Sequence, residues 1–126
     1  MYYLSREFVF DAAHRITDYQ GKCEKLHGHT YHLKVTIKGD IKTDGMVIDF
    51  AIMKKIVDET VVNKLDHSYL NDLFKNPTTE NVAYWIYSKL LKEFKKYHCT
   101  LYAVSLTEGS NNTVTFVEER NERRTE

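Results

Sequence analysis

The feature of this sequence that most constrains its fold is the alternation of apolar and polar residues near its N-terminus. Apolar side chains recur at alternate positions in residues 3–14 and again in residues 27–38. A period of two places successive side chains on opposite faces of a β-strand, so each segment is predicted to form a strand with one buried face. The polar stretch 18–26, which contains Gly21, is predicted to be the loop between them.

Two segments in the middle of the chain have the spacing of amphipathic helices instead. The first helix is predicted for residues 50–63, with Asp49 as its N-cap. A second helix is predicted to start at Thr78 or Thr79, either of which could cap it, and to end near Tyr97. Both segments carry an apolar stripe, so both helices are expected to pack against the sheet.

The C-terminal part returns to strand-like patterns. Residues 101–108 and 113–118 are predicted to form a β-hairpin around the turn sequence 109–112, Gly-Ser-Asn-Asn. The resulting order, ββααββ, predicts a single α+β domain over residues 1–118, with a four-stranded antiparallel sheet and both helices on one face. The polar tail 119–126 is predicted to be disordered.

Composition narrows the class of protein. The chain of 126 residues is long enough for one hydrophobic core and too short for two. Its 18 basic and 18 acidic side chains balance, which argues against nucleic acid or an anionic membrane as a partner. We expect no signal peptide and no membrane span. Two cysteines, Cys23 and Cys99, are too few for a disulfide framework, so a cytoplasmic protein with reduced thiols is expected.

Three histidines are predicted to converge at one end of the sheet. His14 shares the parity of the apolar face of the first strand, while His27 and His29 share that of the second. If the two strands pair antiparallel, the end of one lies beside the start of the other. Three neutral imidazoles bind zinc well and leave a fourth position open, as a catalytic zinc requires. The alternative is a set of ordinary core or surface histidines; His32 has the opposite parity and is assigned to the sheet surface.

Other polar positions each have a functional and a structural interpretation. Cys23 lies in the loop before His27, where a zinc ion would favour a thiolate base, but it could equally be a spectator. The pair Asp66 and His67 could form a proton relay, or merely cap a turn between the helices. Glu108 has the parity of an apolar face, so its carboxylate needs a partner. A flat ligand edge with two parallel N–H donors would serve, and so would a salt bridge.

Together these segments resemble the 6-pyruvoyltetrahydropterin synthase and 6-carboxytetrahydropterin synthase family, whose subunits have the tunnelling fold. The resemblance spans residues 8–118 and rests on motifs that are specific as an ordered set. These are Phe8-Val9-Phe10-Asp11-Ala12-Ala13-His14, Cys23-Glu24-Lys25-Leu26-His27-Gly28-His29, Gly45-Met46-Val47-Ile48-Asp49-Phe50, Leu65-Asp66-His67, Pro77-Thr78-Thr79-Glu80-Asn81 and Thr107-Glu108.

The resemblance implies roles for these residues. The three histidines would hold a catalytic zinc ion, with Cys23 as the general base and the Asp66–His67 dyad in support. Glu108 would anchor the pterin ring, and Thr78, Thr79 and Glu80 would contribute to its pocket. The implied substrate is 7,8-dihydroneopterin triphosphate. Family members associate as trimers and usually hexamers, with sites between subunits, which would also cover the edges of a small open sheet.

The spacing around Cys23 bears on the branch of the family. Only Glu24, Lys25 and Leu26 separate it from His27, which resembles the 6-carboxytetrahydropterin synthase of queuosine biosynthesis, a lyase that releases acetaldehyde and triphosphate. Glu24 stands where a further branch uses glutamate as the base and forms 6-hydroxymethyl-7,8-dihydropterin for folate, so a second or bifunctional activity is open. The 6-pyruvoyltetrahydropterin synthase reaction is another alternative, and a zinc-stabilised pterin-binding domain is the non-enzymatic one.

Overall fold

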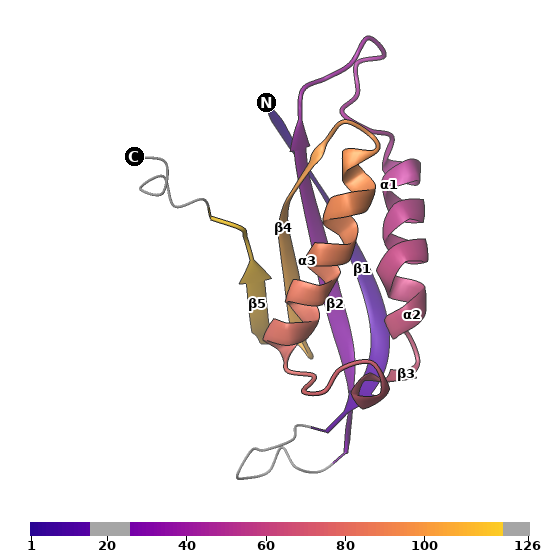
Figure 1. The fold of residues 1–126 in the computed structure, drawn as a ribbon, viewed down its shortest axis with the longest axis vertical. Helices are drawn as coiled ribbons and strands as arrows, with labels where there is room; N and C mark the ends of the chain where they lie inside the picture. Colours follow the sequence, from indigo (N-terminus) through magenta and orange to yellow (C-terminus); the bar gives the residue numbers. More distant parts are fainter. Residues whose placement is uncertain (16–25, 120–126) are drawn as a thin grey trace.

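The computed structural model describes residues 1–15 and 26–119 of the chain. The predictions for Cys23, Glu24 and residues 120–126 therefore lie outside the described residues. The described part forms one five-stranded sheet with the strand order β3-β1-β2-β4-β5 (Figure 1). Its strands are β1 (Tyr2–His14), β2 (His27–Gly39), β3 (Ser68–Tyr69), β4 (Thr100–Glu108) and β5 (Asn112–Phe116).

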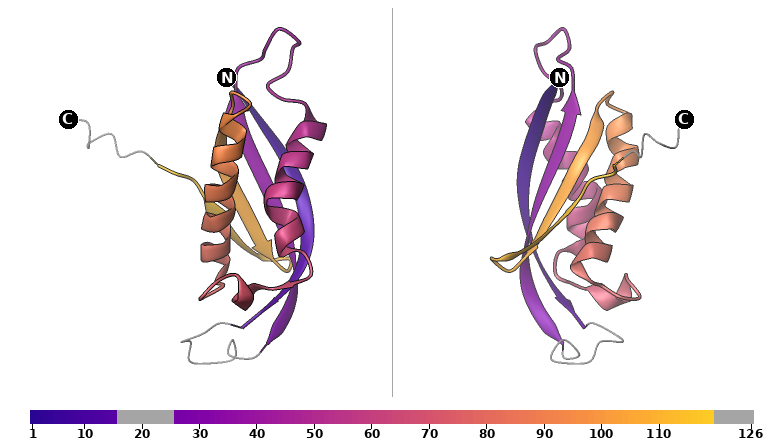
Figure 2. Two further views of the ribbon diagram at one scale, coloured as in Figure 1. Left: turned by 45° about the vertical axis from the view of Figure 1, so that its right-hand side comes forward. Right: turned by 90° about the vertical axis from the view of Figure 1, so that its left-hand side faces the viewer.

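The helices form a second layer on one face of this sheet (Figure 2). They are α1 (Phe50–Val57), the π-helical segment η2 (Asp58–Val62), α2 (Asn63–Leu65), the short 3₁₀ helix η3 (Leu70–Asp72) and α3 (Thr79–Lys95). Asp49 caps α1 by accepting from the Ala51 N–H at 2.6 Å, as predicted. Thr78 caps α3 by accepting from the Asn81 N–H at 3.1 Å, which decides between the two candidate threonines.

The prediction of four antiparallel strands was wrong in one respect, because the sheet is mixed. Ser68 and Tyr69 pair parallel to β1, opposite Ala12 and Ala13. The chain enters this pairing through His67, whose φ of 58° turns the backbone so that its N–H donates to the Asp11 carbonyl at 2.6 Å. A two-residue strand is too short to produce an alternating pattern, which is why residues 64–77 read as a loop.

The hydrophobic core lies between the helices and the face of the sheet to which the apolar residues of β1 and β2 point. Its largest fully buried side chains include Tyr31, Phe10, Leu33, Ile37, Met53, Ile86, Leu90 and Phe94. The two long strands pair antiparallel over their whole length, from Tyr2↔Gly39 to His14↔His27. The predicted alternation is therefore confirmed. Within the described residues, no helix combines the length and the apolarity that crossing a membrane requires.

Candidate active site

The end of the β1–β2 ladder brings the predicted histidine positions together. His14 lies directly opposite His27, and His29 lies opposite Ala12, one step further into the sheet. Alternate residues of a strand project to one face, and His14 and His29 share the core face at this end of the sheet. The side chain of His27 lies outside what the structure describes. The side chains of His14 and His29 can be placed.

His14 is held in a buried, aromatic environment. Only 3% of its surface is exposed, and its ring stacks on that of His29 with 5.0 Å between centroids. Its Nδ1 is 2.8 Å from the hydroxyl of Tyr31, which is completely buried. Burial, and secondarily the negative charge of Glu108, raise the pKa of Tyr31 well above its ordinary value, so this phenol remains neutral.

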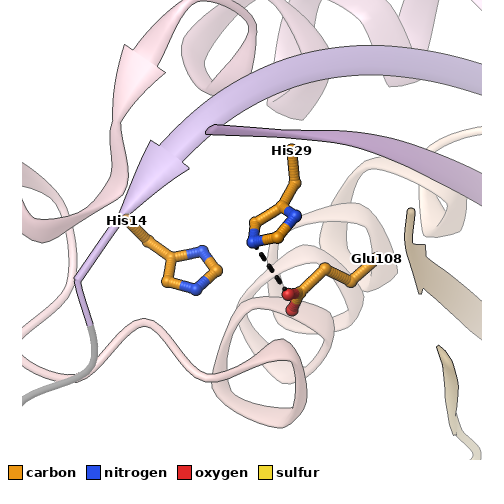
Figure 3. Close-up of side chains that lie close together, drawn as sticks. All are labelled: His14, His29 and Glu108. Atoms are coloured by element: carbon orange, nitrogen blue, oxygen red, sulfur yellow. Dashed lines mark ion pairs between the residues drawn. The ribbon is translucent and has the colours of Figure 1, made fainter. Parts of the chain in front are cut away.

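Glu108 completes a cluster with the two described histidines (Figure 3). It ends β4 opposite Tyr31, and its Oε1 is 3.0 Å from His29 Nε2. Its other oxygen, Oε2, accepts from the Thr79 hydroxyl at 2.8 Å. One potential ligand atom from each of His14, His29 and Glu108 lies within 4.8 Å of the others, close enough to share a metal ion. The carboxylate thus lies between the histidines and the start of α3.

The three residues predicted to line the pterin pocket occupy different environments. Thr78 uses its hydroxyl to cap α3, whereas Thr79 orients the Glu108 carboxylate. Glu80 is exposed in the first turn of the helix, where its negative charge is favourable near the positive end of the helix dipole. Of the three, only Thr79 is in direct contact with the cluster.

Asp66 and His67 do form a pair. Asp66 Oδ1 lies 3.0 Å from His67 Nδ1 and also accepts from the Asp11 N–H at 3.0 Å. The bond from Asp11, and after it the contact with His67, hold the pKa of Asp66 below its ordinary value. The Thr30 hydroxyl donates to the Asp11 carboxylate at 2.6 Å. The imidazole of His67 is 81% exposed to solvent.

The dyad and the histidine cluster are two separate groups of side chains. Asp11 alternates with the buried Phe10 and Ala12, so its side chain points away from the helices. A shallow recess of about 400 Å³ at this end of the sheet is lined by residues that include Asp11, Thr30 and His67, and also by His29. The side chains of Asp66 and His67 group with the outward-pointing Asp11, whereas those of His14 and His29 group with Glu108.

One residue that sequence reasoning missed fixes the backbone next to His14. The side chain of Asn71, in η3, accepts from the Arg15 N–H and donates to the Arg15 carbonyl, both at 2.7 Å. Asn71 thus takes the place of a neighbouring strand for the residue that follows β1. Its only signal in the sequence is a lone asparagine in a loop, which carries no information about so distant a partner.

We expect Asn71→Ala to lower the free energy of unfolding by about 1–3 kcal/mol, because two hydrogen bonds worth roughly 0.5–1.5 kcal/mol each are lost. Urea denaturation followed by circular dichroism would measure the change. Asn71→Asp keeps the acceptor for the Arg15 N–H and loses the donor, so a substantial part of the loss should remain. Equal stability of wild type and Asn71→Ala would show that the two Asn71–Arg15 hydrogen bonds contribute nothing to the free energy of unfolding.

Comparison with known proteins decides the family. The family model described as 6-pyruvoyl tetrahydropterin synthase matches residues 3–119. The chain belongs to this family. The resemblance inferred from the sequence motifs is therefore confirmed, and so is the prediction that the protein is a lyase of the tetrahydropterin synthase type.

Individual relatives of the 6-pyruvoyl tetrahydropterin synthase family carry different names. The chain is 43% identical over 97 residues to a 6-carboxy-5,6,7,8-tetrahydropterin synthase of Synechocystis, covering 71% of this chain and 75% of that protein. It is 46% identical over 101 residues to a dihydroneopterin monophosphate aldolase of Pyrococcus furiosus, covering 80% and 84%. The solved structure of Caenorhabditis elegans 6-pyruvoyl tetrahydropterin synthase matches with a TM-score of 0.83 and 30% identity, covering 94% and 96%.

Proposed function

We propose that this protein is a zinc-dependent 6-carboxy-5,6,7,8-tetrahydropterin synthase that converts 7,8-dihydroneopterin triphosphate with release of acetaldehyde and triphosphate. The observation that carries the proposal is the cluster of His14, His29 and Glu108, in which two imidazoles and a carboxylate lie side by side. The short spacer between Cys23 and His27 and the similarity to a relative with this name support the choice of branch.

The donor set fits zinc. Imidazole nitrogens are preferred ligands of this ion, and the proposed set of His14, His27 and His29 would leave a position for substrate. When bound, zinc would act as a Lewis acid toward the oxygens of the substrate side chain. Because His29 and Glu108 are within hydrogen-bonding distance, a side chain bound at the histidines would place the pterin ring near the carboxylate.

The protein's own residues supply the other steps. Glu108, oriented by the Thr79 hydroxyl, would accept two parallel N–H bonds from the pterin ring and fix its position. Cys23, as a thiolate, would remove a proton from the side-chain carbon next to the bound oxygens. His67, held by Asp66, would move protons at the side-chain oxygens and so allow the carbon–carbon bond to break.

The last role requires a second copy of the chain. The dyad groups with the outward-pointing Asp11, whereas His14 and His29 group with Glu108 on the helix-covered face. A complete site would therefore combine the histidines of one subunit with the dyad of another, in the trimer or hexamer that we propose. The exposed Tyr3, Val9 and Tyr102 are apolar surface that such association would cover.

A second reaction is favoured by a specific observation. The Pyrococcus furiosus relative, 46% identical, is named a dihydroneopterin monophosphate aldolase, and Glu24 is available as an alternative base. Cleavage of the side chain to 6-hydroxymethyl-7,8-dihydropterin is therefore the main alternative, alone or beside the first activity. The 6-pyruvoyl tetrahydropterin synthase reaction is compatible with the same site.

Product analysis separates these reactions. The zinc-loaded protein would be given 7,8-dihydroneopterin triphosphate, and in parallel the monophosphate, with mass spectrometry and acetaldehyde trapping as readouts. Carboxytetrahydropterin with an equal amount of acetaldehyde is expected, and Cys23→Ala should abolish it. Hydroxymethyldihydropterin as the main product would overturn the proposed branch. If this product persisted in Cys23→Ala and was lost in Glu24→Gln, Glu24 would be the base.

A further inference from the structure

Tyr31 occupies the centre of the candidate site without being one of its proposed ligands. It lies two residues after His29 on β2, opposite Glu108 on β4, and its hydroxyl reaches His14 Nδ1 at 2.8 Å. Its ring stacks on Phe10 with 5.1 Å between centroids and 14° between planes, and it meets His29 edge-on at 6.1 Å. With no exposed surface, this phenol has a fixed position.

A neutral imidazole can bind a metal through only one nitrogen while the other carries a proton. The hydrogen bond made by one ring nitrogen determines which nitrogen carries the proton and which can bind the metal. If Nδ1 of His14 donated to the Tyr31 oxygen, Nε2 would be left deprotonated and able to coordinate. If the phenol donated to Nδ1 instead, the proton of the neutral ring would sit on Nε2 and coordination there would be blocked.

We propose that Tyr31 is a positioning residue that engages Nδ1 of His14 and thereby leaves Nε2 as the nitrogen able to bind the metal. The stacking on Phe10 fixes the phenol ring, and the hydroxyl then fixes the rotation of the imidazole about its bond to the backbone. His14 is the last residue of β1, and His29 is the third residue of β2. The inference rests on the proposed metal site and does not depend on which pterin product forms.

Removing the hydroxyl tests this role directly. Tyr31→Phe keeps the stacking ring, and we expect its affinity for zinc, measured by competition with a chromophoric chelator, to fall about tenfold or more. Tyr87→Phe is the matched control, since Tyr87 is also buried but packs against Phe116, away from the histidines. It should bind zinc as wild type does. In the cobalt-substituted proteins, the absorption bands should shift for Tyr31→Phe and stay in place for Tyr87→Phe.

Each outcome bears on the proposal. Wild-type zinc affinity together with an unchanged cobalt spectrum in Tyr31→Phe would overturn the role of Tyr31 while leaving the metal site intact. Absence of metal binding by the wild-type protein would overturn the site and this inference together. If Tyr31→Phe did not fold, nitrogen-15 NMR of the histidines in the zinc-loaded wild type would show which nitrogen of His14 binds the metal. A protonated Nδ1 and a metal-bound Nε2 on His14 are expected, and the reverse assignment would overturn the proposal.

Discussion

Replacing His29 with alanine is expected to abolish high-affinity metal binding and to reduce turnover of the pterin substrate to background. His29 makes two contacts in the cluster, because its ring stacks on His14 and its Nε2 contacts the Glu108 carboxylate. Loss of even an outer partner of a metal ligand costs roughly 10- to 100-fold in affinity, so loss of a ligand should cost at least about 100-fold. Metal content after dialysis and kcat/KM on 7,8-dihydroneopterin triphosphate would be measured together.

The matched control is His32→Ala, three residues along the same strand. His32 pairs with Val9 and Thr107 and points to the outer face, so its removal should leave the metal content unchanged. Comparing the thermal unfolding midpoints of the metal-free variants and wild type would show whether a loss of activity reflects a loss of stability. If His29→Ala lost metal but kept full activity, the metal would have no catalytic part. If metal removal alone unfolded the wild type, the zinc-stabilised binding domain would become the better description.

The sequence was sufficient to place His14 and His29 on one face of the sheet, because strand alternation determines which face each residue occupies. His14 and His29 take their faces from neighbours such as Phe10 and Tyr31, whose burial leaves no freedom of register. Parity in β4 placed Glu108 on the core face in the same way, and the structure adds that His29 is its partner.

The location of Asp66 and His67 could not be obtained in this way. Their position depends on the continuous helical run through η2 and α2 and on the positive φ of His67, after which the chain joins the edge of β1. None of these features has a periodic signature, and the π-helical turns of η2 add a residue to the helical repeat. Residue spacing could identify an acid–imidazole pair but not the face of the sheet on which it lies.

If the dyad of one chain acts with the histidines of another, mixing two inactive variants should restore activity. His29→Ala and His67→Asn should each be inactive alone, the second because loss of a general acid–base group costs about 10²–10⁴-fold. Asparagine is chosen since it tolerates the left-handed backbone of position 67. When the two variants are co-expressed with different tags and mixed assemblies are isolated, activity should return to about a quarter to a third of wild type. In every mixed trimer one site in three pairs intact histidines with an intact dyad, and in randomly mixed hexamers about one site in four does.

The control for this recovery is a mixture of His29→Ala with the double variant His29→Ala/His67→Asn, in which no site can combine two intact halves. It should remain inactive at the same degree of mixing. Recovery in the first mixture alone would require a site shared between chains, because neither chain contributes a complete one. Verified mixed assemblies without activity would instead mean that the dyad and the histidines act within one copy.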